Sequence, residues 1–167
     1  DDIKPSSRKY PRIIFKFEKD VGNDLLTVTK LRKMAGAEVL FGDLSFSVNK
    51  GDKIAFLSRE GSTISTLFSI LTEEDQPDGG QFRWGQSTLR THFPKDVSNF
   101  FNVDLNLIDW LRQYSKERDE NFIRSFLGKM LFGGEETLKK ANVLSGGEKV
   151  RCLLARMMLQ GANVLIL

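Results

Sequence analysis

Two short stretches of the chain carry residues whose types and spacing suit phosphate binding. In the first, Gly146 and Gly147 stand between Ser145 and Glu148, just ahead of an amphipathic run. Glycines let a backbone approach a ligand closely, and the free N–H groups and dipole of a helix start favour an anion. An ordinary helix start, with Ser145 as N-cap and Glu148 in the first turn, would show the same string. The string alone therefore leaves both interpretations open.

The second stretch reads "FLSREGSTISTLFSIL", an apolar segment followed by a Gly/Ser loop and a helical pattern. This is the order of a phosphate-binding loop of the form G-x-x-x-x-G-K-[ST]. On that pattern Ser58 and Thr63 occupy the two glycine positions, and Ile64 occupies the lysine position. Ser65 supplies the hydroxyl that would meet Mg²⁺. Only Gly61 and the final hydroxyls agree with the pattern, so the motif is degenerate.

Composition narrows the class of protein. The 167 residues are enough for one domain with a sizeable core, and 40% are hydrophobic. The net charge of +3 is compatible with an anionic partner such as RNA. Cys152 is the single cysteine, which excludes an internal disulfide framework and favours a reducing compartment. No apolar run reaches membrane-spanning length, so we expect a cytoplasmic protein without membrane insertion.

Periodicity predicts an alternation of strands and helices. We expect strands at residues 12–17, 25–31, 53–57, 89–93 and 163–167, and a short strand within 76–85. Between residues 34 and 52 we expect short strands separated by turns at Gly36, Gly42 and Gly51. The turn before 53–57 reads as a hairpin. Helical patterns cover 104–115, 120–131 and 148–160. Because a domain rarely ends on a bare apolar run, we expect the chain to be a fragment.

The segment "LSGGEKVRCLLARMMLQGANVLIL" resembles the signature motif, signature helix and Walker B strand of ATP-binding cassette (ABC) ATPases. Its "LSGGEK" form is similar to the ABC-F group, twin-cassette proteins that act on ribosomes. "LLTVTKL" and "VLFGDLSFSVNKGDKIAFL" look like the cassette's first strands, and "IKPSSRKYP" looks like the linker between cassettes. The resemblance implies an α/β, P-loop NTPase-like cassette that is incomplete at the C-terminus. Its expected parts are an antiparallel β subdomain, a mostly parallel core sheet and a helical signature subdomain.

The resemblance also implies a domain plan and an activity. Residues 1–11 would end the inter-cassette linker, and 12–167 would form a truncated second cassette with its helical signature subdomain at about 102–147. The full-length protein would hydrolyse ATP with Mg²⁺ and act in translation. The chain ends before the family's Asp-Glu pair, so it would hold no catalytic residue and would be inactive alone. The implied partners are the first cassette, arranged head to tail, and the ribosome or its RNA.

Departures from the family gather at this chain's own nucleotide loop. That loop would comprise Ser58, Arg59, Glu60, Gly61, Ser62, Thr63, Ile64, Ser65 and Thr66. The adenine-stacking position falls on Ala35 and the Q-loop glutamine position on Lys95. A charge-assisted hydrogen bond to phosphate contributes about 1.5–3 kcal/mol, and Ile64 offers none. We therefore expect weak or absent nucleotide binding here.

The signature residues, by contrast, are complete. They are Leu144, Ser145, Gly146, Gly147 and Glu148. In the family each ATP lies between one cassette's Walker A loop and the other's signature, so these residues would complete the partner cassette's site. Three alternatives stay open. Arg59 or Lys95 could rescue ATP binding, the chain could be a non-catalytic dimerisation or partner-binding module, or it could be the ATP-binding subunit of a membrane transporter.

Overall fold

The computed structural model describes residues 9–167, so most of the predicted linker at 1–11 lies outside the described part. The chain divides into two compact units, each described here by itself. The sheet unit comprises residues 17–92 and 163–167, and the helical unit comprises residues 9–16 together with 93–162. No helix in the described part of the chain is long and apolar enough to cross a bilayer.

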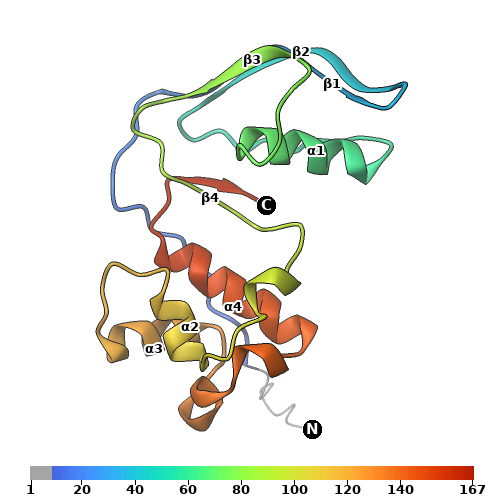
Figure 1. Ribbon diagram of the computed structural model, residues 1–167. Coiled ribbons are helices and arrows are strands. Elements are labelled where there is room, and N and C mark those ends of the chain that lie inside the picture. Colours follow the sequence, from blue (N-terminus) through green and yellow to red (C-terminus); the bar gives the residue numbers. More distant parts are fainter. Residues whose placement is uncertain (1–8) are drawn as a thin grey trace, which may run out of the picture. The chain divides into compact units, whose positions relative to one another are not determined.

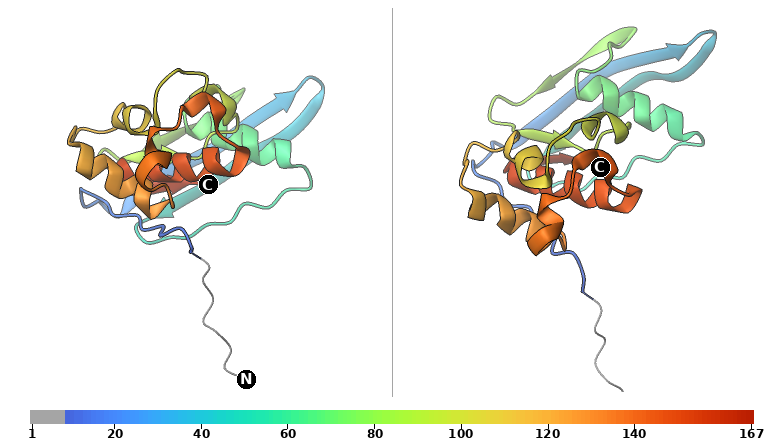
Figure 2. Two further views of the ribbon diagram at one scale, coloured as in Figure 1. Left: turned by 90° about the horizontal axis from the view of Figure 1, so that it is seen from below. Right: turned by 60° about the horizontal axis from the view of Figure 1, so that its bottom comes forward.

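The sheet unit is built on an antiparallel sheet in the order β2-β1-β3. Its strands are β1 (Asp24–Ala35), β2 (Glu38–Asn49) and β3 (Gly79–Trp84). Helix α1 (Gly61–Leu71) lies along one face of this sheet (Figures 1 and 2). Side chains from the two layers form one buried cluster, made of Leu26, Val28, Leu31, Leu67, Ile70 and Leu71. The predicted strand at 25–31 and the antiparallel subdomain are confirmed.

Two glycines fix the course of the antiparallel sheet. Gly36 turns β1 into β2 with a φ of 62°, a left-handed conformation that glycine adopts without strain. Gly80 also has a positive φ, and a Cβ there would lie 2.2 Å from the carbonyl oxygen of Lys30. Lys30 sits where the register of β1 is irregular, so Gly80 lets β3 approach that irregularity closely. The turn predicted at Gly42 is wrong, because Gly42 lies within the continuous strand β2.

A second, parallel pair joins β4 (Arg90–His92) to β5 (Val164–Ile166). This confirms the strands predicted at 89–93 and 163–167. The strand predicted at 53–57 is wrong: the segment has no ladder partner in the described part of the chain, and Leu57 is 95% exposed. A strand is stable only when its backbone groups are paired, and here β4 and β5 pair with each other.

Two further predictions for the strands need correction. The turn at Asn49–Asp52 forms, with the N–H of Asp52 donating to the carbonyl of Asn49 at 3.1 Å, but no second strand follows to make a hairpin. Residues 12–17 run extended without joining a sheet. The N–H of Arg12 donates instead to the carbonyl of Lys129 at 2.7 Å, and Phe15 packs on the core of the helical unit. Ile13, Ile14 and Phe17 are exposed, so Phe15 alone of the apolar side chains in that segment packs on the helices.

The helical unit contains the three helices that periodicity predicts; the first two are shorter than predicted, and the third begins two residues earlier and ends one residue earlier. They are α2 (Leu107–Arg112), α3 (Glu120–Lys129) and α4 (Gly146–Leu159), with short 3₁₀ turns η1 (Ser98–Phe100), η2 (Gly134–Leu138) and η3 (Ala141–Val143). The side chains of Asn106, Asp119 and Ser145 cap the three α-helices. Their inner faces meet in one core centred on Trp110, Leu127 and Leu153, which holds α4 and its N-terminus in place.

Candidate functional site

Helix α4 begins with a reciprocal capping box. The Ser145 hydroxyl accepts the N–H of Glu148 at 3.4 Å, and the Glu148 Oε2 accepts the N–H of Ser145 at 2.8 Å. The first helical hydrogen bond, from Lys149 to the carbonyl of Ser145, measures 2.9 Å. The amides of Gly146 and Gly147 meet no acceptor in the described part of the chain. Two donors therefore remain open at the positive end of α4, where an anion is favoured.

Packing does not explain the two glycines. A Cβ at Gly146 or Gly147 would meet no atom within 4 Å, and neither residue has a positive φ. Any residue would therefore fit both the space and the backbone angles. Neither space nor backbone strain therefore requires glycine at these two positions.

An ion pair fixes the acidic member of the capping box. The ammonium of Lys139 lies 2.6 Å from Oε1 of Glu148, so the two carboxylate oxygens have different partners. The hydrogen bond from Lys139, followed by the one from the Ser145 amide, lowers the pKa of Glu148 from 4.5 to about 2. Glu148 is therefore ionised throughout the physiological pH range, and its carboxylate keeps its capping geometry.

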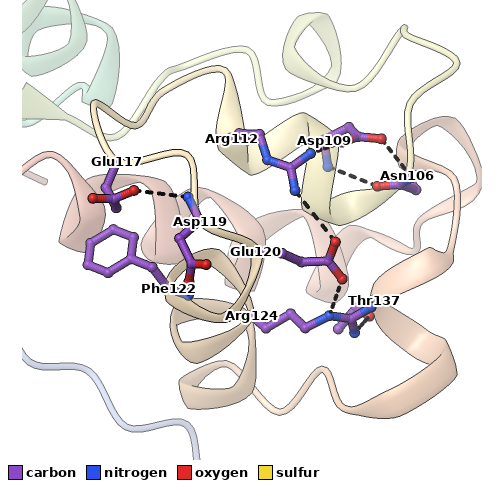
Figure 3. Close-up of polar contacts among 9 residues, drawn as sticks. All are labelled: Asn106, Asp109, Arg112, Glu117, Asp119, Glu120, Phe122, Arg124 and Thr137. Carbon is purple, nitrogen blue, oxygen red and sulfur yellow. Dashed lines mark hydrogen bonds and ion pairs between the residues drawn. The ribbon is translucent and has the colours of Figure 1, made fainter.

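A chain of polar contacts supports the segment from which Lys139 projects (Figure 3). Arg112 pairs with Asp109 on its own helix and lies 3.8 Å from Glu120 of α3. Glu120 accepts from Arg124 at 2.8 Å, and Arg124 donates to the hydroxyl of Thr137. That hydroxyl is buried and donates to the carbonyl of Gly134 at 2.7 Å, which holds η2 closed. The contacts thus tie α2 and α3 to the turn that immediately precedes Lys139.

Backbone bonds anchor the same segment to the start of α2. The carbonyl of Lys139 accepts the N–H of Leu107 at 3.1 Å, and the N–H of Ala141 donates to the carbonyl of Leu105 at 2.8 Å. This short antiparallel contact leaves the backbone at 139–141 little freedom. The position of Lys139 is therefore set by the helical core rather than by its own side chain.

The body of α4 is buried among the other helices. Cys152 and Leu153 are fully buried, and Arg151 donates to the carbonyl of Met130 at 3.2 Å. Burial raises the pKa of the Cys152 thiol to about 12, so it behaves as a small apolar group. Val150, which periodicity places on the apolar face, is 39% exposed. The inner face of α4 is therefore rotated away from Val150 and toward Cys152.

The predicted nucleotide loop has a different form. Helix α1 already begins at Gly61, so only Ser58, Arg59 and Glu60 form a loop. The N-cap residue is Glu60, whose side chain makes no capping bond. No residue from 58 to 66 has a positive φ, and the Ser65 hydroxyl donates to the carbonyl of Gly61 at 3.1 Å. Thr63, Ile64, Ser65 and Thr66 follow ordinary helical geometry and do not wind into a phosphate cradle.

The remaining predicted positions are distributed over the two units. Ala35 is the exposed last residue of β1, and Arg59 lies in the sheet unit, whereas Lys95 belongs to the helical unit. Arg59 and Lys95 are exposed and make no ion pair within residues 9–167. Residues 9–167 contain no group of three or more His, Cys, Asp or Glu side chains that could hold a metal ion. The structure therefore does not bring Ala35, Arg59 and Lys95 together in one compact unit.

Comparison with known proteins identifies the class. Residues 41–167 match the family model described as "ABC transporter", and the chain belongs to this family. A bacterial Atm1-family ABC exporter with ATP bound has the same fold, with a TM-score of 0.69 over 92% of this chain and 31% of that chain at 14% identity. The α/β cassette fold is therefore confirmed.

Two curated relatives narrow the comparison. The chain is 54% identical over its whole length to the Bacillus subtilis protein YkpA, described as an uncharacterized ABC transporter ATP-binding protein. It is 31% identical over 88% of its length to EttA of Escherichia coli K12, described as an energy-dependent translational throttle protein. The chain spans 31% of YkpA and 27% of EttA.

Sequence reasoning found the signature residues but missed their support. No local pattern in the sequence singles out Lys139, Arg124 or Thr137. Lys139 and Glu148 are nine positions apart, which is not the spacing of a contact within one helix, so their pairing depends on the fold of the segment between them.

Proposed function

We propose that the start of α4 binds the terminal phosphate of an ATP held by another cassette. The observation that carries this proposal is the pair of open amides at Gly146 and Gly147 on a capped helix start that no side chain covers. Both glycines are exposed, and the dipole of a 14-residue helix adds to their amides. Each hydrogen bond to a charged phosphate oxygen would contribute about 1.5–3 kcal/mol.

The second part of the proposal concerns which of the two cassettes holds ATP and which completes the ATP site. This chain's own loop binds nucleotide weakly or not at all, since Ile64 replaces the lysine and the backbone at 61–66 is helical. ATP with Mg²⁺ is held by the first cassette of the same protein and completed by this chain's signature. Within this scheme residues 12–167 form the second cassette, with its helical signature subdomain at about 102–147.

The cellular role follows from the relatives and the motif. We propose an ABC-F type ATPase that acts on the ribosome in the cytoplasm. The "LSGGEK" form, the similarity to EttA and the net charge of +3 support this role. Ribosomal RNA is the anionic partner, and ATP hydrolysis by the full-length protein supplies the energy.

The test uses the full-length protein and one arginine substitution. Ser145→Arg removes the N-cap and places a long side chain before the glycine amides, so ATPase activity should fall at least roughly tenfold, the loss of one charged hydrogen bond. Asn142→Arg, at an exposed residue three positions earlier, is the matched control and should keep its activity. Unchanged activity in Ser145→Arg would overturn the proposal that this signature completes an ATP site.

A second candidate is the ATP-binding subunit of a membrane transporter. The description of YkpA as an ABC transporter ATP-binding protein, at 54% identity, favours it. The two candidates differ in what the full-length protein binds. Co-sedimentation with ribosomes that depends on ATP supports the ABC-F role, and co-purification with an integral membrane protein supports the transporter role.

A further inference from the structure

The capping box creates an electrostatic conflict at the proposed phosphate site. Glu148 lies in the first turn of α4, one residue after the open amide of Gly147, and its carboxylate is ionised. An anionic side chain there stabilises the helix dipole but repels a second anion at the same helix end. A phosphate can bind well only if the charge of Glu148 is compensated while its capping bond is kept.

Lys139 meets both requirements with one contact. Its ammonium pairs with Oε1 of Glu148 at 2.6 Å, which leaves Oε2 free to accept the Ser145 amide at 2.8 Å. The side chain of Glu148 is 16% exposed and that of Lys139 is 42% exposed, so solvent screens this pair less than the more exposed pair of Lys140 and Asp104. The ion pair thus neutralises the carboxylate and orients it at the same time.

The fold holds Lys139 in place from both sides. Its N–H donates to the carbonyl of Glu136 at 3.2 Å within the turn that Thr137 closes, and its carbonyl accepts from Leu107. We propose that Lys139 is a positioning residue of the signature, whose charge lets the start of α4 accept a polyphosphate beside Glu148. The inference deepens the proposed function and rests on it.

The neighbouring lysine provides an internal comparison. Lys140 is one residue away and pairs with Asp104 at 3.0 Å. Asp104 takes no part in the capping box, and both side chains are more exposed than Glu148. Removal of either lysine changes the net charge equally. A difference between the two variants therefore reports on the contact with Glu148 and not on overall charge.

The experiment measures kcat and KM for ATP hydrolysis by the full-length protein. Lys139→Met should lower kcat/KM roughly tenfold, since an uncompensated carboxylate then faces the phosphate. Lys140→Met should stay within roughly twofold of the wild type. Lys139→Arg should restore most of the activity, because it keeps the charge. Equal losses in Lys139→Met and Lys140→Met, or no loss in Lys139→Met, would overturn the inference.

A double variant separates charge compensation from a merely structural role. Glu148→Gln removes the negative charge but keeps an oxygen that can accept the Ser145 amide. Lys139→Met combined with Glu148→Gln should therefore recover at least half of the kcat/KM lost in Lys139→Met. A double variant as inactive as Lys139→Met would refute charge compensation. Ser145→Arg, run in parallel, tests the proposed function itself: if it leaves ATPase activity unchanged, the site fails regardless of Lys139.

Discussion

The starts of α4 and α1 offer a comparison between two glycine-containing helix N-termini in one chain. At α4 a serine and a glutamate cap each other, an ion pair fixes the glutamate, and two amides remain open. At α1 the capping position holds Glu60 without a side-chain bond, and the first turn carries no acidic residue. The two helix starts therefore differ in how they are capped, and under the proposed function only the start of α4 binds phosphate.

The largest expected effect comes from filling the space before the open amides. Gly147→Leu should lower ATPase activity of the full-length protein roughly a hundredfold, the equivalent of two lost hydrogen bonds to phosphate. The fold should survive, because a Cβ at that position meets nothing within 4 Å.

Gly61→Leu is the matched substitution at α1, since a Cβ there also meets no atom within 4 Å. It should change the ATPase rate by less than roughly twofold and should raise the helix propensity. Similar losses of activity in both variants would show that the two helix starts are equivalent and would break the comparison.

Substitutions at the N-caps of α4 and α1 should change the free energy of unfolding in opposite directions. Ser145→Ala should lower the free energy of unfolding by about 1 kcal/mol, the usual loss for an N-cap hydroxyl. Glu60→Ser should raise it by about 0.5–1 kcal/mol, because α1 then gains the cap it lacks. Urea unfolding followed by circular dichroism measures both changes, and a destabilising Glu60→Ser would contradict the assignment of that cap position.

Acid should act on α4 through Glu148. Its pKa is lowered in the folded protein to about 2, so its contribution to stability is complete above the unfolded value of about 4.5 and is lost as the pH falls through about 2. Glu148→Gln should therefore remove part of the loss of stability between pH 4.5 and pH 2. Amide hydrogen exchange in the first turn of α4 would follow this loss locally, and identical pH profiles for both proteins would exclude it.

We expect the smallest effect from Ile64→Lys, which tests the loop before α1 most directly. Ile64→Lys restores the missing cation but not the loop, because Gly61–Thr66 already belong to α1. The number of ATP molecules bound per full-length chain should stay the same in equilibrium dialysis. An additional bound ATP would show that the lysine alone was missing and that the backbone adapts around it.

The sequence predicted the elements with strong local signals. Periodicity located the three helices of the helical unit, and alternating apolar residues located β1. The strand predicted at 53–57 is wrong. Its apolar run fits a buried strand, but a strand also needs hydrogen-bonding partners elsewhere in the chain. The buried face of α4 also differs from the predicted one, because Val150 is exposed. The surrounding helices decide which apolar positions of α4 are buried.

The candidate site, like the fold, could be predicted from the sequence only where its residues are adjacent in the chain. Ser145, Gly146, Gly147 and Glu148 are contiguous, so their pattern is visible in the sequence. Whether the two glycine amides are free, and which lysine meets Glu148, depends on the contacts among α2, α3 and η2. Such contacts join residues far apart along the chain, and no local pattern encodes them.

The buried thiol of Cys152 has a practical consequence. It is the single cysteine of the chain, it is fully buried, and its pKa of about 12 keeps it protonated at neutral pH. Maleimide reagents attack thiolates, so this chain has almost no background reactivity. A new cysteine at exposed Asn142 would accept a fluorophore selectively, and its emission would test in real time whether a nucleotide reaches the start of α4.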